Sequence, residues 1–241
     1  KNLSLFAHAI LQSLAIGPLL VVYSYATARF NFPLYDDTYI AIDRALGFDW
    51  LAHMRFVDAR AWLAGVLMFA YSSFIGQITF LLCVAFAYKQ AAQAQRFIFL
   101  FLVTGVICVT LAALFPAVAG YVHYNINVAT LIHLPPATRI HEAPLFAMRN
   151  HSENVIAFPL RGLVTFPSFH ASAGVLLIYL AWPMRRLRLL IIPLNLLLIA
   201  SVMYAGGHWL IDAIGGVAIA LLGIGAISLF CHRPNFLFRK F

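Results

Sequence analysis

The chain has 241 residues, of which 63% are hydrophobic and only 10% are charged. Too few polar side chains are present to cover the surface of a soluble domain of this length, so we expect an integral membrane protein. The formal net charge of +8 would suit a nucleic-acid-binding protein, but the placement of the cations along the chain favours a membrane protein instead.

Six apolar stretches are long enough to be considered as membrane spans, since about 20 helical residues cross about 30 Å of hydrocarbon. In chain order they are Leu5–Ala28, Trp62–Tyr88, Phe97–Ala119, Thr165–Trp182, Leu187–Tyr204 and His208–Phe230. The first is too long and too polar for the core of a signal peptide, so we expect it to be retained. The second is too long for one straight crossing, and its first half is expected to form an interfacial or broken helix. Pro183 ends the short fourth stretch, and Pro193 is expected to kink the fifth.

The prediction is an all-α, polytopic membrane helix bundle with six transmembrane helices, forming a single domain over residues 1–241. Three cysteines lie in apolar runs or at one membrane edge, which argues against both a disulfide framework and a zinc site.

The cations divide unevenly between the two sides of such a bundle. Six crossings place both termini on one side, together with the short connections at 89–96 and 183–188. That side carries nine of the 16 cations and no acid, whereas the other side carries all eight acids. Lysine and arginine accumulate on the cytoplasmic side of membrane proteins. We therefore expect cytoplasmic termini, location in a bacterial inner membrane, the lipid bilayer as a partner and no nucleic acid; the oligomeric state is left open.

Two long connections fall on the other, extracytoplasmic side, at about 29–61 and 120–164. Connections longer than about 12–15 residues usually carry function or structure of their own. The first contains ALGFDW and charges of alternating sign, which favour a helix lying in the membrane interface. The second contains four histidines and Pro135–Pro136, and we expect it to fold over the membrane face as a lid.

Two histidines and one carboxylate fall at the extracytoplasmic ends of the predicted spans. FPSFHASAGV places His170 at the start of the fourth span, and GGHWLIDAIGG places His208 and Asp212 at the start of the sixth. Because His208 and Asp212 are four residues apart, we expect them on the same face of one helix. A carboxylate there can accept from one imidazole nitrogen and raise the basicity of the other. Each feature alone has a structural explanation, but three polar groups at one membrane depth predict a functional site.

The residues beside these groups are candidates for binding an anion. Ser168 is expected to cap the helix that follows it, and the backbone N–H groups of Ser168 and Phe169 can hold anionic oxygens. Gly206 and Gly207 either form a tight turn or allow the backbone to approach a ligand closely, and the sequence does not separate these two explanations.

The motifs PSFH and HWLID resemble the P-S-x-H and H-x-x-x-D signatures of the type 2 phosphatidic acid phosphatase (PAP2) superfamily. FPSFHA with GGHWLID, the FDW of the first connection and LFPA at 114–117 resemble more specifically its inositolphosphorylceramide-synthase-like branch. The resemblance implies that His208 attacks phosphorus as a nucleophile, that Asp212 orients it, and that His170 protonates the leaving oxygen. It also implies that no metal or other cofactor is needed.

The sequence departs from the superfamily in its cations. The superfamily carries an upstream lysine–arginine motif and an arginine six residues before the histidine of H-x-x-x-D. Here that position is Val202, and residues 114–117 contain no cation. The phosphate charge must be met elsewhere, and Arg161 is the first candidate, followed by Arg139 and Arg149. The alternative for each is a solvated loop or a lipid-headgroup contact.

These features predict a membrane enzyme that acts on lipid phosphates through a phosphohistidine intermediate. A phosphodiester carries one charge where a monoester carries nearly two, so the dispersed cations favour head-group transfer from a phospholipid to a lipid alcohol. The aromatic residues that we expect to grip the second substituent of a diester are Tyr121, Tyr124, Phe146 and Phe158. One alternative is a lipid phosphate monoester phosphatase with water as the acceptor. An alternative of another class is a non-enzymatic lipid transporter, whose polar residues would lie near the middle of the membrane.

Overall fold

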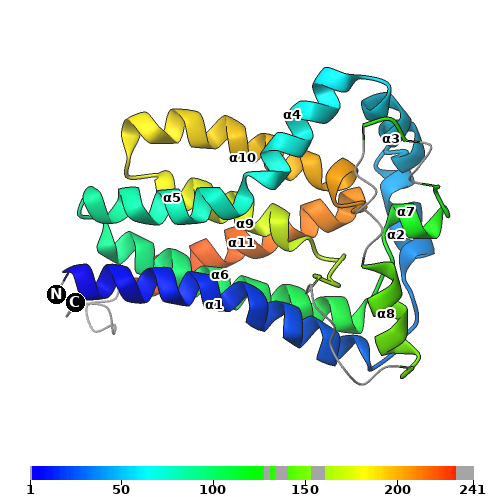
Figure 1. Ribbon diagram of the computed structural model, residues 1–241, viewed down its shortest axis with the longest axis horizontal. Coiled ribbons are helices and arrows are strands. Elements are labelled where there is room, and N and C mark those ends of the chain that lie inside the picture. Colours follow the sequence, from blue (N-terminus) through cyan, green and yellow to red (C-terminus); the bar gives the residue numbers. More distant parts are fainter. Residues whose placement is uncertain (1, 128–130, 134–140, 153–160, 232–241) are drawn as a thin grey trace.

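A computed structural model describes residues 2–127, 131–133, 141–152 and 161–231. These residues form α-helices and contain no strand, which confirms the all-helical prediction. Figure 1 shows long helices lying side by side along the longest axis of the molecule, with short helices packed across one end. The long helices are α1 (Asn2–Ala28), α5 (Phe74–Ala87), α6 (Ala91–Leu114), α9 (Phe169–Ala181), α10 (Arg185–Ala205) and α11 (Leu210–Cys231), and α4 (Ala61–Ser72) joins them at an oblique angle.

The short helices are α2 (Asp36–Ala45), α3 (Trp50–Asp58), α7 (Gly120–His123) and α8 (Glu142–Arg149). We call these four helices the end layer, because they lie across the end of the bundle that is opposite to the start of α1 (Figure 1). Helices α2 and α3 occupy the first long connection, where the sequence predicted a helix. ALGFDW (45–50) lies mainly in the turn between them, and a position in the membrane interface stays a prediction. Helices α7 and α8 belong to the second connection, of which residues 128–130, 134–140 and 153–160 lie outside the described part. A lid in that connection therefore stays a prediction.

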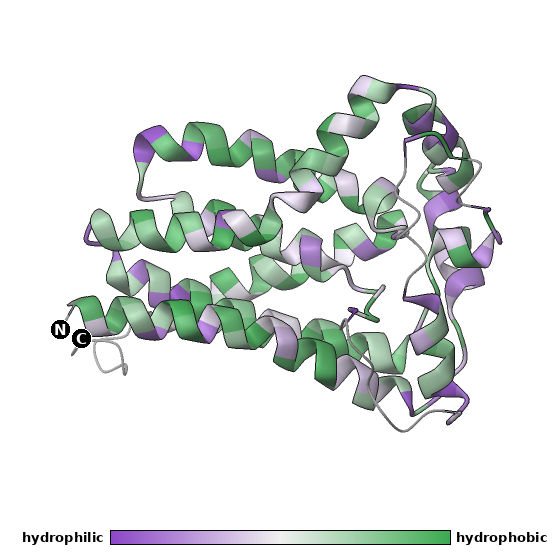
Figure 2. Ribbon diagram, in the orientation of Figure 1, coloured by the Kyte–Doolittle hydropathy of each residue, from purple (hydrophilic) through white to green (hydrophobic). Residues whose placement is uncertain are grey.

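Within the described residues, α1, α6, α10 and α11 are each long and apolar enough to cross a membrane. Helices α4 and α5 pass the same test as a pair and are bent by 52° at the break between them. The expected break in the second apolar stretch is thus confirmed. Figure 2 shows hydrophobic residues along the long helices and hydrophilic residues concentrated at the ends of the bundle. This distribution is the one expected of a bundle surrounded by lipid.

Helix α9 corresponds to the fourth expected span and has only 13 residues. At 1.5 Å per residue it extends about 20 Å, which is less than the hydrocarbon thickness of about 30 Å. Six full spans therefore stay a prediction. The helix ends at Ala181, shortly before Pro183, as expected.

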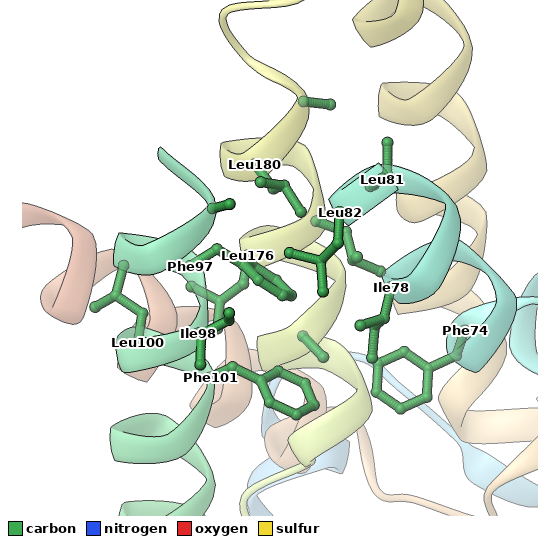
Figure 3. Close-up of a cluster of buried hydrophobic side chains, with 14 of the residues drawn as sticks. Phe74, Ile78, Leu81, Leu82, Phe97, Ile98, Leu100, Phe101, Leu176 and Leu180 are labelled. Atoms are coloured by element: carbon green, nitrogen blue, oxygen red, sulfur yellow. The ribbon is translucent and has the colours of Figure 1, made fainter. Parts of the chain in front are cut away.

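Helix α9 lies at the centre of the bundle and packs against α5, α6, α10 and α11. In Figure 3 its side chains Leu176 and Leu180 lie between Phe97 of α6 and Leu82 of α5, and all four are fully buried. On another side, a Cβ atom at Gly174 would approach Ile199 of α10 to 3.0 Å, so the lack of a side chain allows close helix packing. The bundle thus holds the start of α9, where His170 lies, in a fixed position relative to its neighbours.

Candidate active site

His208 and Asp212 form the contact that the sequence predicted. The His208 Nδ1 atom lies 3.2 Å from Asp212 Oδ2, and both side chains are buried. Because an ionised carboxylate only accepts hydrogen bonds, this geometry places the proton on Nδ1 and leaves Nε2 for a substrate. The prediction that both residues lie on one helix face is wrong, however. Helix α11 begins at Leu210, so His208 lies in the preceding turn, and only Asp212 is helical.

The turn that carries His208 depends on its two glycines. Gly207 has a φ angle of +70°, and a Cβ atom there would lie 2.6 Å from the ring of Tyr121. The carbonyl oxygen of Gly207 accepts a hydrogen bond from the Gly120 N–H at 2.9 Å. A Cβ atom at Gly206 would lie 2.7 Å from the His208 ring. These contacts favour the tight-turn explanation for both glycines, and Gly207 as a ligand contact stays untested.

Helix α2 of the end layer fixes the start of α11. The Asp43 carboxylate accepts hydrogen bonds from the backbone N–H groups of Leu210 and Ile211, at 2.8 and 2.9 Å. These N–H groups belong to the first turn of α11 and have no partner within the helix. Burial raises the pKa of Asp43 above its ordinary value of 3.8, and the two hydrogen bonds oppose this effect. Asp43 therefore acts as a helix cap supplied from a distant segment.

Two tryptophans connect the same turn to the end layer. Trp50 Nε1 donates to the carbonyl oxygen of His208 at 3.0 Å. Trp209 is fully buried, and its Nε1 donates to Asp36 Oδ1 at 3.0 Å. The Asp36 carboxylate also accepts from the Val118 N–H at 3.0 Å, and burial raises its pKa above the ordinary value. The His208 backbone carbonyl and the next residue, Trp209, are thus anchored to the end layer.

His170 is the second residue of α9 and lies between two aromatic rings from the bent pair α4 and α5. Its ring stacks on Tyr71 with 4.5 Å between centroids, and the Phe74 centroid is 5.0 Å away. The start of α9 lies against the start of α11, since the Ser168 N–H donates to the Asp212 carbonyl oxygen at 2.9 Å. The structure therefore brings the three predicted catalytic residues to one region at the starts of α9 and α11.

Ser168 links these two helices directly. Its side chain caps α9 by accepting from the Ala171 N–H, as predicted. Its own N–H donates to the carbonyl oxygen of Asp212 at 2.9 Å, so this N–H does not point to a phosphate as the sequence suggested. A Cβ atom at Gly216 of α11 would collide with the Ser168 carbonyl group, which shows how closely the two helices approach. The backbone N–H of Phe169, the first residue of α9, has no partner within the helix and remains a candidate for anion binding.

The candidate phosphate-binding arginines lie in different places. Arg161 is partly buried in the segment that leads to α9, and its buried Nε has no hydrogen-bond partner. Arg149 lies on α8, is 7% exposed, and donates to the Phe32 carbonyl oxygen at 2.8 Å. Arg139 lies outside the described residues. Val202, which replaces the superfamily arginine, is fully buried and packs in a cluster with Ala171 and Ala213.

The aromatic residues that the sequence suggested as a substrate grip have mainly structural contacts. Tyr121 is fully buried, and its hydroxyl donates to the Tyr204 carbonyl oxygen. That role for Tyr121 is therefore wrong, because no part of its side chain is exposed to a substrate. Tyr124 stacks on Trp50, and Phe146 packs against a separate apolar cluster. Phe158 lies outside the described residues.

Sequence reasoning missed Asp36 and Asp43, which hold the catalytic turn, and it noted Trp50 only within FDW, without a role. Their hydrogen-bond partners are more than 80 positions away along the chain. A local sequence motif therefore gives no signal of these contacts. One available signal was that every acid falls on the same predicted side as the histidine pair. Carboxylates beside an apolar interface are costly unless hydrogen-bonded, which suggests that some of them accept bonds from buried backbone.

A family model described as the PAP2 superfamily matches residues 38–226. The matched segment contains His170, His208 and Asp212, as well as Asp43 and Trp50. No curated protein and no solved structure gives a significant match. The match is to the superfamily, so the inositolphosphorylceramide-synthase-like branch stays a prediction.

Proposed function

We propose that this chain, which belongs to the PAP2 superfamily, is a membrane phosphotransferase. It passes a phosphate-bearing head group from a phospholipid to a lipid alcohol. Superfamily membership itself supports phosphatase or phosphotransferase chemistry in a membrane setting. The observation that carries the histidine nucleophile is the buried hydrogen bond between His208 Nδ1 and Asp212 Oδ2, beside the start of α9, where His170 lies.

In the first half-reaction, His208 Nε2 attacks the donor phosphorus and forms a P–N bond. The bond between phosphorus and the oxygen of the leaving alcohol breaks, and His170 supplies the proton that this oxygen takes up. The Asp212 carboxylate stabilises the positive charge on the His208 ring and keeps Nε2 directed at the substrate. The product is a covalent phosphohistidine whose phosphorus still carries the head group, and the lipid alcohol has left.

In the second half-reaction, the hydroxyl oxygen of the acceptor lipid attacks the same phosphorus. Its proton passes to His170, the P–N bond breaks, and His208 returns to its initial state. If water replaces the alcohol, the same steps release a hydrolysed product, so the identity of the acceptor separates a transferase from a phosphatase.

The charge of the site supports a phosphodiester donor. Val202 contributes no cation, and Arg161 is the described arginine closest in sequence to His170. We propose that Arg161 contacts the phosphate, with the Phe169 N–H and Arg139, which lies outside the described residues, as further candidates. A single cation balances the one charge of a diester better than the nearly two charges of a monoester.

We further propose six membrane crossings, with α9 as the fourth and the active site facing away from the cytoplasm in a bacterial inner membrane. The support is the acid-free group of cations on the side of the termini. A cysteine placed at exposed Gly162, near the active-site end, should then react with a membrane-impermeant reagent added from outside in a variant that lacks the native cysteines.

The proposal is tested by supplying the purified protein in lipid nanodiscs with phosphatidic acid or a phosphatidylinositol-type donor, with diacylglycerol or ceramide as the acceptor. We expect an acceptor-dependent transfer product from the diester, no product with His208→Ala, and unchanged rates with EDTA. Rapid phosphate release from phosphatidic acid, with no transfer product from any diester, would instead identify a lipid phosphatase. Loss of activity with EDTA and its recovery with zinc would contradict the histidine nucleophile.

A further inference from the structure

A small, partly open pocket lies between the C-terminal ends of α1 and α6, helix α8 and residues 163–165. His170, His208 and Asp212 are not among the residues that line it, so it is distinct from the candidate active site. Four alanines and five polar residues are among the residues that line it. The alanines are Ala28, Ala112, Ala113 and Ala117, and the polar residues are Ser24, Thr27, Asn31, Arg149 and Thr165.

Arg149 gives this pocket a buried positive charge. Its side chain is nine-tenths buried, and its one hydrogen bond goes to the neutral carbonyl oxygen of Phe32. Within the described part of the chain, no carboxylate forms an ion pair with it. Asp36 is near enough to interact electrostatically, but both of its oxygens already accept from Val118 and one of them from Trp209.

The charge of Arg149 is retained despite its burial. Burial lowers the pKa of its guanidinium, an effect that the Asp36 charge opposes, yet arginine remains protonated at neutral pH. A buried guanidinium has five N–H donors in a planar arrangement that suits a phosphate or carboxylate. A buried cation that no carboxylate contacts in an ion pair is energetically unfavourable, so the pocket is suited to receive an anion from outside the chain.

The position of the pocket indicates what carries this anion. It lies at the ends of two apolar helices, each of which exposes large apolar side chains, such as Val22 on α1 and Leu114 on α6. In a membrane, these faces contact hydrocarbon and the helix ends reach the head-group region. An anion at Arg149 can therefore be the polar head of an amphiphile whose chains lie along α1 and α6.

We propose that the pocket between α1, α6 and α8 binds the anionic head group of a membrane lipid, with Arg149 as the counter-charge. The lipid site is separate from the catalytic cluster and does not depend on the reaction that the cluster performs.

The test uses the full-length His208→Ala protein in detergent, so that turnover cannot consume the ligand. Binding of dioleoylphosphatidylglycerol is followed by native mass spectrometry and by the rise in unfolding temperature, with phosphatidylcholine and inorganic phosphate as parallel ligands. We expect phosphatidylglycerol to bind and Arg149→Gln to weaken its binding about tenfold or more, since a charge-assisted hydrogen bond is lost. Ala113→Leu, which narrows the pocket and keeps the charge, should also weaken binding.

Arg44→Gln is the matched control, because Arg44 is an exposed arginine of the same end layer and should bind the lipid as the parent does. Equal binding by the parent and Arg149→Gln would overturn the proposal. Equal stabilisation by inorganic phosphate and by phosphatidylglycerol would overturn the lipid assignment in favour of a free-anion site. A lipid that binds the wild-type protein but not His208→Ala would lie at the catalytic cluster instead.

Discussion

The helix bundle and the end layer bury polar groups in different ways. In the bundle, buried hydroxyls such as that of Ser201 donate to carbonyl oxygens of their own helix, and Asn195 donates to Gln77 across α10 and α5 at 2.7 Å. In the end layer, buried aspartates accept hydrogen bonds from segments far away in the sequence. The hydroxyl bonds within one helix do not constrain its neighbours, whereas bonds between distant segments, the Asn195–Gln77 bond included, fix one element relative to another.

This difference assigns a separate task to each region. The bundle positions α9 and α11 by apolar packing, which tolerates small changes of volume at moderate cost. The end layer sets the orientation of the turn before α11, where a shift of about 1 Å can reduce catalysis about 100-fold. We therefore expect substitutions in the end layer to affect turnover and substitutions in the bundle to affect stability.

Asp43→Ala should have the largest effect on turnover among the residues outside the catalytic cluster. It removes the acceptor of the Leu210 and Ile211 N–H groups, so the turn with His208 loses its attachment to α2. We expect kcat to fall by about 10- to 100-fold, with a loss of about 1–3 kcal/mol in the free energy of unfolding. Steady-state kinetics and thermal unfolding measure the two effects.

The matched control is Asp37→Ala, on the same helix. Asp37 has a side chain that is 97% exposed, and its contact with His123 spans 3.8 Å. A surface pair of this kind contributes little to stability, so both kcat and the unfolding temperature should remain near the wild-type values. Equal losses in the two variants would show that α2 does not position the turn.

Asn195→Leu should sharpen the comparison from the side of the bundle. This change removes the donor to Gln77 and leaves the Gln77 carbonyl oxygen without its bond in the protein interior. We expect a loss of stability of about 1–3 kcal/mol and a change in kcat of less than about twofold. The double variant Gln77→Met/Asn195→Leu should recover part of the stability, because no unpaired polar group remains. A fall in kcat that matches Asp43→Ala would contradict the division of tasks.

The smallest expected effect concerns Asp58 and pH. Burial acts to raise the pKa of Asp58, but hydrogen bonds from Ile132, His133 and Tyr204 together outweigh it and lower the pKa below 3.8. A lowered folded-state pKa means that the ionised group stabilises the fold above about pH 4, and that this contribution disappears as the pH falls through the lowered pKa. Asp58→Asn should therefore reduce the unfolding temperature near neutral pH, and the difference from wild type should shrink below about pH 4. A difference that grows on acidification would contradict this assignment.

Much of the bundle is predictable because a membrane imposes a simple rule on sequence. Length and hydropathy identified the four long spans and the break between α4 and α5. They could not identify α9 as the central helix, since composition does not indicate which apolar helix is enclosed by the others. Only the packing around Gly174 and Leu176 distinguishes it.

The candidate site was predictable to the extent that its residues are close in sequence or belong to a motif. The four-residue spacing of His208 and Asp212 predicted their contact correctly, although through a turn and not through one helix. The hydrogen bond from the Ser168 N–H to the Asp212 carbonyl oxygen was not predictable, because it depends on how α9 and α11 pack against each other. The same holds for the Asp43 cap, whose donors lie 167 and 168 positions further along the chain.

The central claim is that His208 is a nucleophile held in place by Asp212, and trapping the covalent intermediate tests it most directly. A donor labelled at phosphorus is mixed with the enzyme, the reaction is quenched within milliseconds, and the labelled peptide is identified. We predict an acid-labile, base-stable phosphohistidine at His208, no label in His208→Ala, and labelling slowed by about 10³- to 10⁴-fold in a folded Asp212→Asn protein. Label on another residue, or undiminished labelling of His208→Ala, would contradict the account.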